Sequence, residues 1–130
     1  MSYKKLAKLT SNLQRRTLSG KIDWQETAWR DMFQASLANY SVRVSLVESQ
    51  SAEGQDVKIS IVNEEGVEVE SFRDVDLKQQ WFSEVGTAGH PYEVMLNIYQ
   101  TARRAALGSE KAVSDILEEL DKLDEDEIPF

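Results

Sequence analysis

The chain has 130 residues, a net charge of −8 at pH 7, 41% apolar residues and 29% charged residues. This length fits one domain, and this composition is that of a globular protein with a real core. The absence of cysteine and the single histidine exclude a disulfide scaffold, a thiol nucleophile and histidine-rich metal sites. No apolar run approaches the roughly 18 residues of a membrane span. We therefore expect a cytoplasmic protein without membrane contact.

Charge is distributed unevenly along the chain. Residues 1–22 carry six basic side chains and no acidic one, whereas residues 118–130 carry seven acidic side chains and one basic one. The middle of the chain is also acidic. Because a protein of this charge repels nucleic acid, we expect no direct nucleic-acid binding.

Residues 2–19 are predicted to form an amphipathic helix. Leu6, Leu9 and Leu13 recur at helical spacing on one side, and basic residues occupy another. Gly20 follows as a left-handed stop. Such a helix usually packs its leucines on the core and leaves its lysines in water.

Four segments between residues 33 and 70 alternate apolar and polar side chains, the pattern of strands with one buried face. Their apolar residues are Phe33, Ala35 and Leu37; Val42, Val44 and Leu46; Val57, Ile59 and Ile61; and Val67 and Val69. Turn-forming or polar residues separate the segments at 38–40, 48–56 and 63–66. Short connections between consecutive strands predict an antiparallel meander.

Two helices are predicted after the strands. Pro91 fits the first position of a helix, Gly108 ends that helix, and Ser109 is a suitable N-cap for the next. Their apolar stripes are Tyr92, Met95, Ile98, Tyr99, Ala102 and Ala106 in the first, and Val113, Ile116, Leu117 and Leu120 in the second. We predict an α+β fold with an N-terminal helix, a four-stranded antiparallel meander and two C-terminal helices on one face of the sheet. Residues 1–123 then form a single domain, and residues 124–130 form an acidic tail.

The segment 73–89 between sheet and helices contains Trp81 and Phe82 among polar residues and glycines. At least one of the three tryptophans, Trp24, Trp29 and Trp81, is expected in the core. Consecutive aromatic side chains cannot easily both face inward. We therefore predict that Trp81 and Phe82 form a partner-binding surface, through which two copies of the chain can associate as a homodimer.

Residues with catalytic potential are few. Glu68, Glu70, Asp74 and Asp76 are close in sequence and could bind a divalent ion or serve acid–base catalysis, but charges at a sheet edge also prevent unwanted strand pairing. His90 precedes Pro91, where a polar capping residue is ordinary. Neither a phosphate-binding glycine loop nor a Gly-x-Ser-x-Gly elbow is present. We predict that the protein is not an enzyme and uses no cofactor or metal.

The last seven residues combine acids with an aromatic end. They are Asp124, Glu125, Asp126, Glu127, Ile128, Pro129 and Phe130. Like charges in series repel and favour an open segment, and Pro129 ends any helix. The segment offers an aromatic plug, a carboxylate for a basic side chain, and acids that steer it to a basic rim.

This tail resembles the acidic tip of bacterial single-stranded-DNA-binding proteins, which also ends in acids followed by Ile-Pro-Phe. In that family the tip docks on genome-maintenance enzymes, with the last Phe in an apolar pocket and its carboxylate on a basic residue. The resemblance implies that Phe130 is the anchor, Pro129 and Ile128 are secondary contacts, and Asp124–Glu127 are steering charges. It covers seven residues. The family's oligonucleotide-binding barrel and long linker do not match the body of this chain, so only the docking role carries over.

The body resembles an uncharacterised family of small bacterial proteins. The resemblance rests on the pattern Thr17-x-x-Gly20-Lys21-Ile22-x-Trp24-x-Glu26-Thr27, then Phe33-Gln34-Ala35-Ser36, and finally Tyr99-x-x-Ala102-Arg103-Arg104-x-Ala106-Leu107. It implies one compact domain and no particular activity.

These observations lead to two candidate functions, a leading one and an alternative. The first is a non-catalytic protein-interaction module whose acidic Ile-Pro-Phe tail docks on DNA replication and repair enzymes. The alternative is an acidic inhibitor or immunity-type protein that mimics DNA and blocks a basic site on its partner. The acids of residues 48–76 matter more in the alternative, and the tail matters more in the first.

Overall fold

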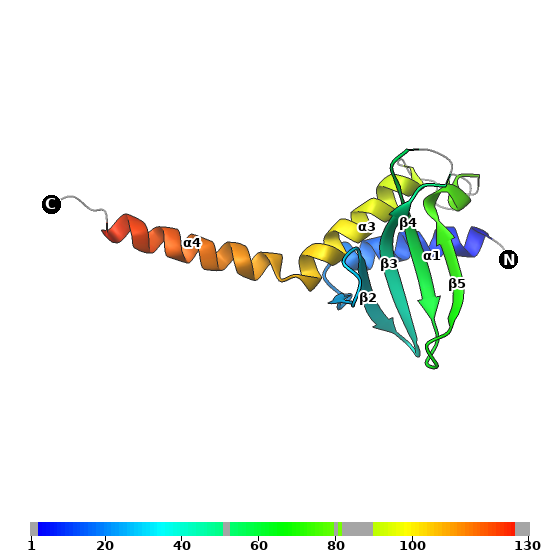
Figure 1. Cartoon of the computed structure of the whole chain (residues 1–130), viewed down its shortest axis with the longest axis horizontal. Helices are drawn as coiled ribbons and strands as arrows, with labels where there is room; N and C mark the ends of the chain where they lie inside the picture. Colours follow the sequence, from blue (N-terminus) through cyan, green and yellow to red (C-terminus); the bar gives the residue numbers. More distant parts are fainter. Residues whose placement is uncertain (1–2, 51–52, 80, 82–89, 127–130) are drawn as a thin grey trace.

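The computed structural model describes residues 3–50, 53–79, 81 and 90–126, and it confirms the α+β class (Figure 1). The elements in chain order are α1 (Tyr3–Leu18), β1 (Gln25–Glu26), β2 (Met32–Leu37), β3 (Tyr40–Glu48), β4 (Gln55–Val62), β5 (Glu68–Arg73), the short 3₁₀ helix η1 (Asp74–Leu77), α3 (Pro91–Ala106) and α4 (Ser109–Asp126).

The sheet is an antiparallel meander in the order β1-β2-β3-β4-β5. It has five strands where four were predicted, because Gln25 and Glu26 pair with Gln34 and Phe33 as the added strand β1. A two-residue strand is too short to show an alternating pattern, so the sequence carried no signal for it.

The predicted alternation places the inward residues correctly on β2, β3 and β4, except that Leu37 at the end of β2 is 37% exposed, and it fails on β5. Phe33, Val44, Ile59 and Phe72 lie in one cross-strand row, and all four are buried. Near the start of β5 the register shifts, so that Val62 pairs with Glu68 and Ile61 with Glu70.

The prediction that Val67 and Val69 face the core is therefore wrong. They are 53% and 50% exposed. A bulge places an extra residue in one strand and reverses which side chains face inward.

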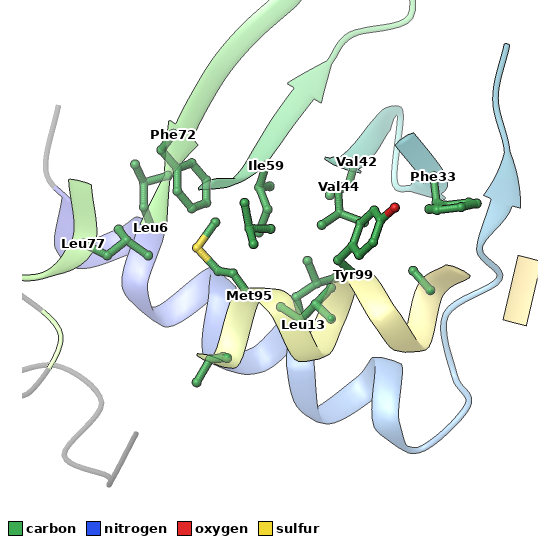
Figure 2. Close-up of a cluster of buried hydrophobic side chains, with 14 of the residues drawn as sticks. Leu6, Leu13, Phe33, Val42, Val44, Ile59, Phe72, Leu77, Met95 and Tyr99 are labelled. Carbon is green, nitrogen blue, oxygen red and sulfur yellow. The ribbon is translucent and has the colours of Figure 1, made fainter. Parts of the chain in front are cut away.

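Helices α1 and α3 cover one face of the sheet side by side and close the core (Figures 1 and 2). Figure 2 shows Leu6 and Leu13 of α1 and Met95 and Tyr99 of α3 meeting the side chains that rise from the strands. The ring of Tyr99 packs on Phe33 with 5.6 Å between centroids. This burial of apolar surface is the main stabilising contribution to the fold.

The prediction that both C-terminal helices lie on the sheet is wrong for α4. Only α3 does, and α4 leads away from the sheet and the other helices (Figure 1). Gly108 makes the turn between them at φ +71, a left-handed conformation that favours glycine. Within the described ranges, none of the helices is both long and apolar enough to cross a bilayer.

Candidate functional site

Helix α4 is the most unusual surface of the molecule. It has 18 residues, so it rises about 27 Å along its axis. Every residue from Glu110 to Asp124 is exposed. Because α4 contacts the domain only near its start, its far end stands clear of the sheet.

The apolar stripe predicted on α4 exists, but it lies in solvent. Its members are Val113, Ile116, Leu117, Leu120 and Leu123, which are between 46% and 60% exposed. The sequence pattern is the same as that of a helix packed on a core, and nothing local distinguishes the two. What decides the difference is Gly108, which directs the helix away from the sheet.

Charge on α4 is concentrated toward its C-terminal end. Residues 118–126 hold six acidic side chains and one basic one, Lys122. The last turn of the helix contains no basic residue. Carboxylates at this position face the negative end of the helix dipole, which is unfavourable in isolation. This half of α4 is therefore suited to meet a positively charged surface.

The predicted tail begins inside this helix. Asp124 is exposed, and the backbone of Glu125 and Asp126 is helical, so the expectation that the acids hold these residues open is wrong. Helix propagation from Ser109 outweighs the repulsion among the acids there. Glu127, Ile128, Pro129 and Phe130 lie outside the described residues.

The structure overturns the surface predicted at Trp81. This side chain is fully buried in the core cluster, and Phe82 lies outside the described residues. Burying a large aromatic side chain gains more than exposing it when the fold leaves room. Trp24 is also buried, whereas Trp29 is 61% exposed. Trp29 shares a hollow of about 530 Å³ with Arg30 and Arg103.

The predicted carboxylate cluster, Glu68, Glu70, Asp74 and Asp76, makes hydrogen bonds and ion pairs within the domain. Glu68 pairs with Lys58 at 3.8 Å, and a carboxylate oxygen of Asp76 accepts a hydrogen bond from the backbone N–H of Arg73 at 2.8 Å. Asp74 accepts the backbone N–H of Val57 at 3.0 Å. No cluster suited to a metal ion occurs in the parts of the chain that the structure describes.

Asp74 is buried beside a second carboxylate, Asp56. Burial raises the pKa of the Asp74 carboxyl above its ordinary value of 3.8, and the neighbouring charge of Asp56 raises the pKa further, while the Val57 N–H opposes the shift. Asp56 in turn pairs with Arg73 at 3.2 Å, and Arg73 also donates to the carbonyl oxygen of Glu48 at 3.0 Å. These contacts join β4, β5 and η1.

Two pairs of arginines, Arg15 with Arg16 and Arg103 with Arg104, stand near the ends of α1 and α3. They line separate hollows, with Arg16 in one, Arg103 beside Trp29 in a second and Arg104 in a third. Each pair lies in the last turn of its helix, and all four are exposed. Among the described residues, neither Arg103 nor Arg104 forms an ion pair. In the sequence, each pair precedes the glycine that follows its helix, Gly20 or Gly108.

Of these arginines, Arg104 lies at the start of α4. A hollow of about 470 Å³ is lined by Leu18 of α1, Arg104 of α3 and Val113 of α4. Leu18 is 56% exposed. The apolar stripe of α4 therefore begins at a hollow whose lining also includes Arg104 and Glu110.

No known protein family, no curated protein and no solved structure matches this chain. The features that indicate a function are therefore the geometry of α4 and the surface around its start.

Proposed function

We propose that this protein is a non-catalytic interaction module whose acidic tail docks on enzymes of DNA replication and repair. The observation that carries the proposal is the direction of α4. This helix leaves the domain and stays exposed through Asp124, so it carries the start of the acidic tail to about 23 Å from the Gly108 turn.

The chemistry of these residues defines the partner's site. Asp124 and the acids after it favour approach to a basic rim, where electrostatic attraction raises the association rate. Phe130 follows Ile128 and Pro129 and supplies an aromatic anchor for an apolar pocket. A pocket of this kind beside a basic residue is what the similar tip of single-stranded-DNA-binding proteins occupies.

The alternative, a DNA mimic built on residues 48–76, has less support from the structure. Asp56 is paired with Arg73, Glu68 with Lys58, and Asp74 is buried. These carboxylates stabilise the sheet edge, whereas the acids of α4 as far as Asp124 are exposed. The tail is therefore the better candidate for contact with a basic partner.

A capture experiment tests the proposal. The intact chain, immobilised through its N-terminus, is expected to retain DNA replication and repair enzymes from a bacterial extract, and a soluble peptide of residues 124–130 is expected to release them. Phe130→Ala should lose this capture. A matched control is Tyr92→Ala, which removes an aromatic side chain that is 39% exposed at the start of α3. Equal recovery on the intact chain and on Phe130→Ala would overturn the proposal.

A further inference from the structure

The two edges of the sheet differ in length. In the part of the chain that the structure describes, β1 and β5 are the outermost strands, so each has a neighbour on one side only (Figure 1). Strand β1 has two residues, whereas β5 has six. An edge strand presents unpaired backbone groups with which another strand can pair, and a very short edge strand limits this pairing. The β5 edge is therefore where pairing with another chain is most favoured.

Exposed valines at both ends of β5 add to this tendency. Val67 and Val69 are 53% and 50% exposed, and Val75, which follows the strand, is 39% exposed. Valine favours extended backbone, and apolar surface beside an open strand edge favours association. These side chains would promote pairing between the β5 edges of two chains unless another feature opposes it.

Two carboxylates occupy outward N–H groups of β5. Glu70 Oε1 accepts a hydrogen bond from the backbone N–H of Ser71 at 2.8 Å, and Asp76 Oδ2 accepts one from the backbone N–H of Arg73 at 2.8 Å. Backbone groups alternate between the two sides of a strand, so residues two apart direct their N–H groups to the same side. This side faces away from β4, because these N–H groups meet carboxylates instead of the carbonyl oxygens of β4.

The same kind of contact completes the sheet on the other side of β5. Asp74, directly after the strand, accepts the backbone N–H of Val57 of β4 at 3.0 Å. Carboxylates thus replace a strand both where β5 ends and along its free edge. A carboxylate forms a stronger hydrogen bond with an N–H than a neutral carbonyl oxygen does. A carbonyl oxygen of an incoming strand is therefore a poor competitor for these donors.

We propose that Glu70 and Asp76 close the β5 edge against pairing with a second copy of the chain, by occupying the N–H groups of Ser71 and Arg73. Removal of both carboxylates leaves the two donors open beside the exposed valines. Two identical edges pair with each other in antiparallel orientation across a two-fold axis, so the expected product is a dimer. This closure does not depend on the docking of the tail on an enzyme.

Sedimentation equilibrium tests the closure. Glu70→Ala combined with Asp76→Ala should raise the association constant at least about tenfold above that of the intact chain, because the freed donors can pair. The charge-matched control is Glu64→Ala combined with Glu65→Ala, which removes two exposed acids from the turn before β5 and should leave association unchanged. If the double variant at 70 and 76 does not fold, Glu70→Ala alone should still show increased association. Association equal to that of the intact chain would overturn the proposal.

Two further variants separate occupied donors from charge repulsion. Glu70→Gln combined with Asp76→Asn removes the same charges but keeps an acceptor oxygen beside each N–H, so its association should stay close to that of the intact chain. Association as strong as that of the alanine variant would show that charge alone opposes pairing, against the proposal.

The second variant locates the interface. Ser71→Pro added to the alanine variant removes one outward donor, and proline is tolerated where the N–H of an edge strand faces outward. This substitution should reverse the association. Association that persists would place the contact away from the β5 edge and contradict the proposal.

Discussion

Two isoleucines on neighbouring helices allow a direct test of where the folded core ends. Ile98 on α3 is fully buried, and Ile116 on α4 is 60% exposed. Replacing each with alanine makes the same chemical change in two helices. The comparison therefore isolates the effect of packing against the domain.

The expected costs differ severalfold. Ile→Ala removes three carbon groups, and at about 0.8 kcal/mol for each buried group the transfer loss at Ile98 is about 2.4 kcal/mol. The cavity left behind raises this loss to about 3–4 kcal/mol. At Ile116 less than half of the side chain is covered, and the higher helix propensity of alanine offsets part of the loss. The expected change in the free energy of unfolding is within about 0.5 kcal/mol.

Urea unfolding followed by tryptophan fluorescence measures both variants, since Trp24 and Trp81 are buried and report on the core. The measurement is made at about 1 μM, a dilution at which weak association between copies of the chain does not contribute to the measured stability. Ile98→Val, with an expected cost of about 1 kcal/mol, serves if Ile98→Ala does not fold. A loss at Ile116→Ala comparable with that at Ile98→Ala would show that α4 packs on the domain and would refute this reasoning.

Four further substitutions test interactions within the domain. Burial raises the pKa of Asp74, so the folded chain binds this proton more tightly than the unfolded chain does. In urea titrations, the stability of the wild type relative to Asp74→Asn should therefore fall as the pH rises from 4 to 7. A difference that does not change with pH would contradict this. Arg73→Gln should lower the free energy of unfolding by about 1–3 kcal/mol, and adding Asp56→Asn should restore part of it, as a double-mutant cycle can show. Gly20→Ala should cost about 1 kcal/mol, because Gly20 ends α1 at φ +74, and a neutral result would show that the turn adapts.

The sequence was sufficient to predict the α+β class, the meander and the helices near their true bounds. These features depend on local periodicity and on turn residues such as Pro91 and Gly108. Both can be read from the sequence alone. The two-residue strand β1 and the bulge in β5 were missed, since strand pairing decides both of them.

The candidate site was less predictable. The stripe on α4 and the stripe on α3 have the same helical spacing, yet only α3 packs on the sheet, because the path of the chain after Gly108 decides which face finds a partner. Trp81 was predicted at the surface and is buried, since its neighbours in sequence are polar but its neighbours in space are apolar. The hollow lined by Leu18, Arg104 and Val113 could not be predicted either, because only the fold brings the ends of α1 and α3 beside the start of α4.

The most direct test of the tail's function is a displacement measurement. A fluorescent peptide with the acidic tip of a single-stranded-DNA-binding protein is bound to a purified repair enzyme that accepts this tip, and its anisotropy is followed as the intact chain is added. The proposed function predicts that the chain displaces the peptide, and that Phe130→Ala weakens displacement at least about tenfold. Displacement that is absent, or equal for the intact chain and Phe130→Ala, would contradict it.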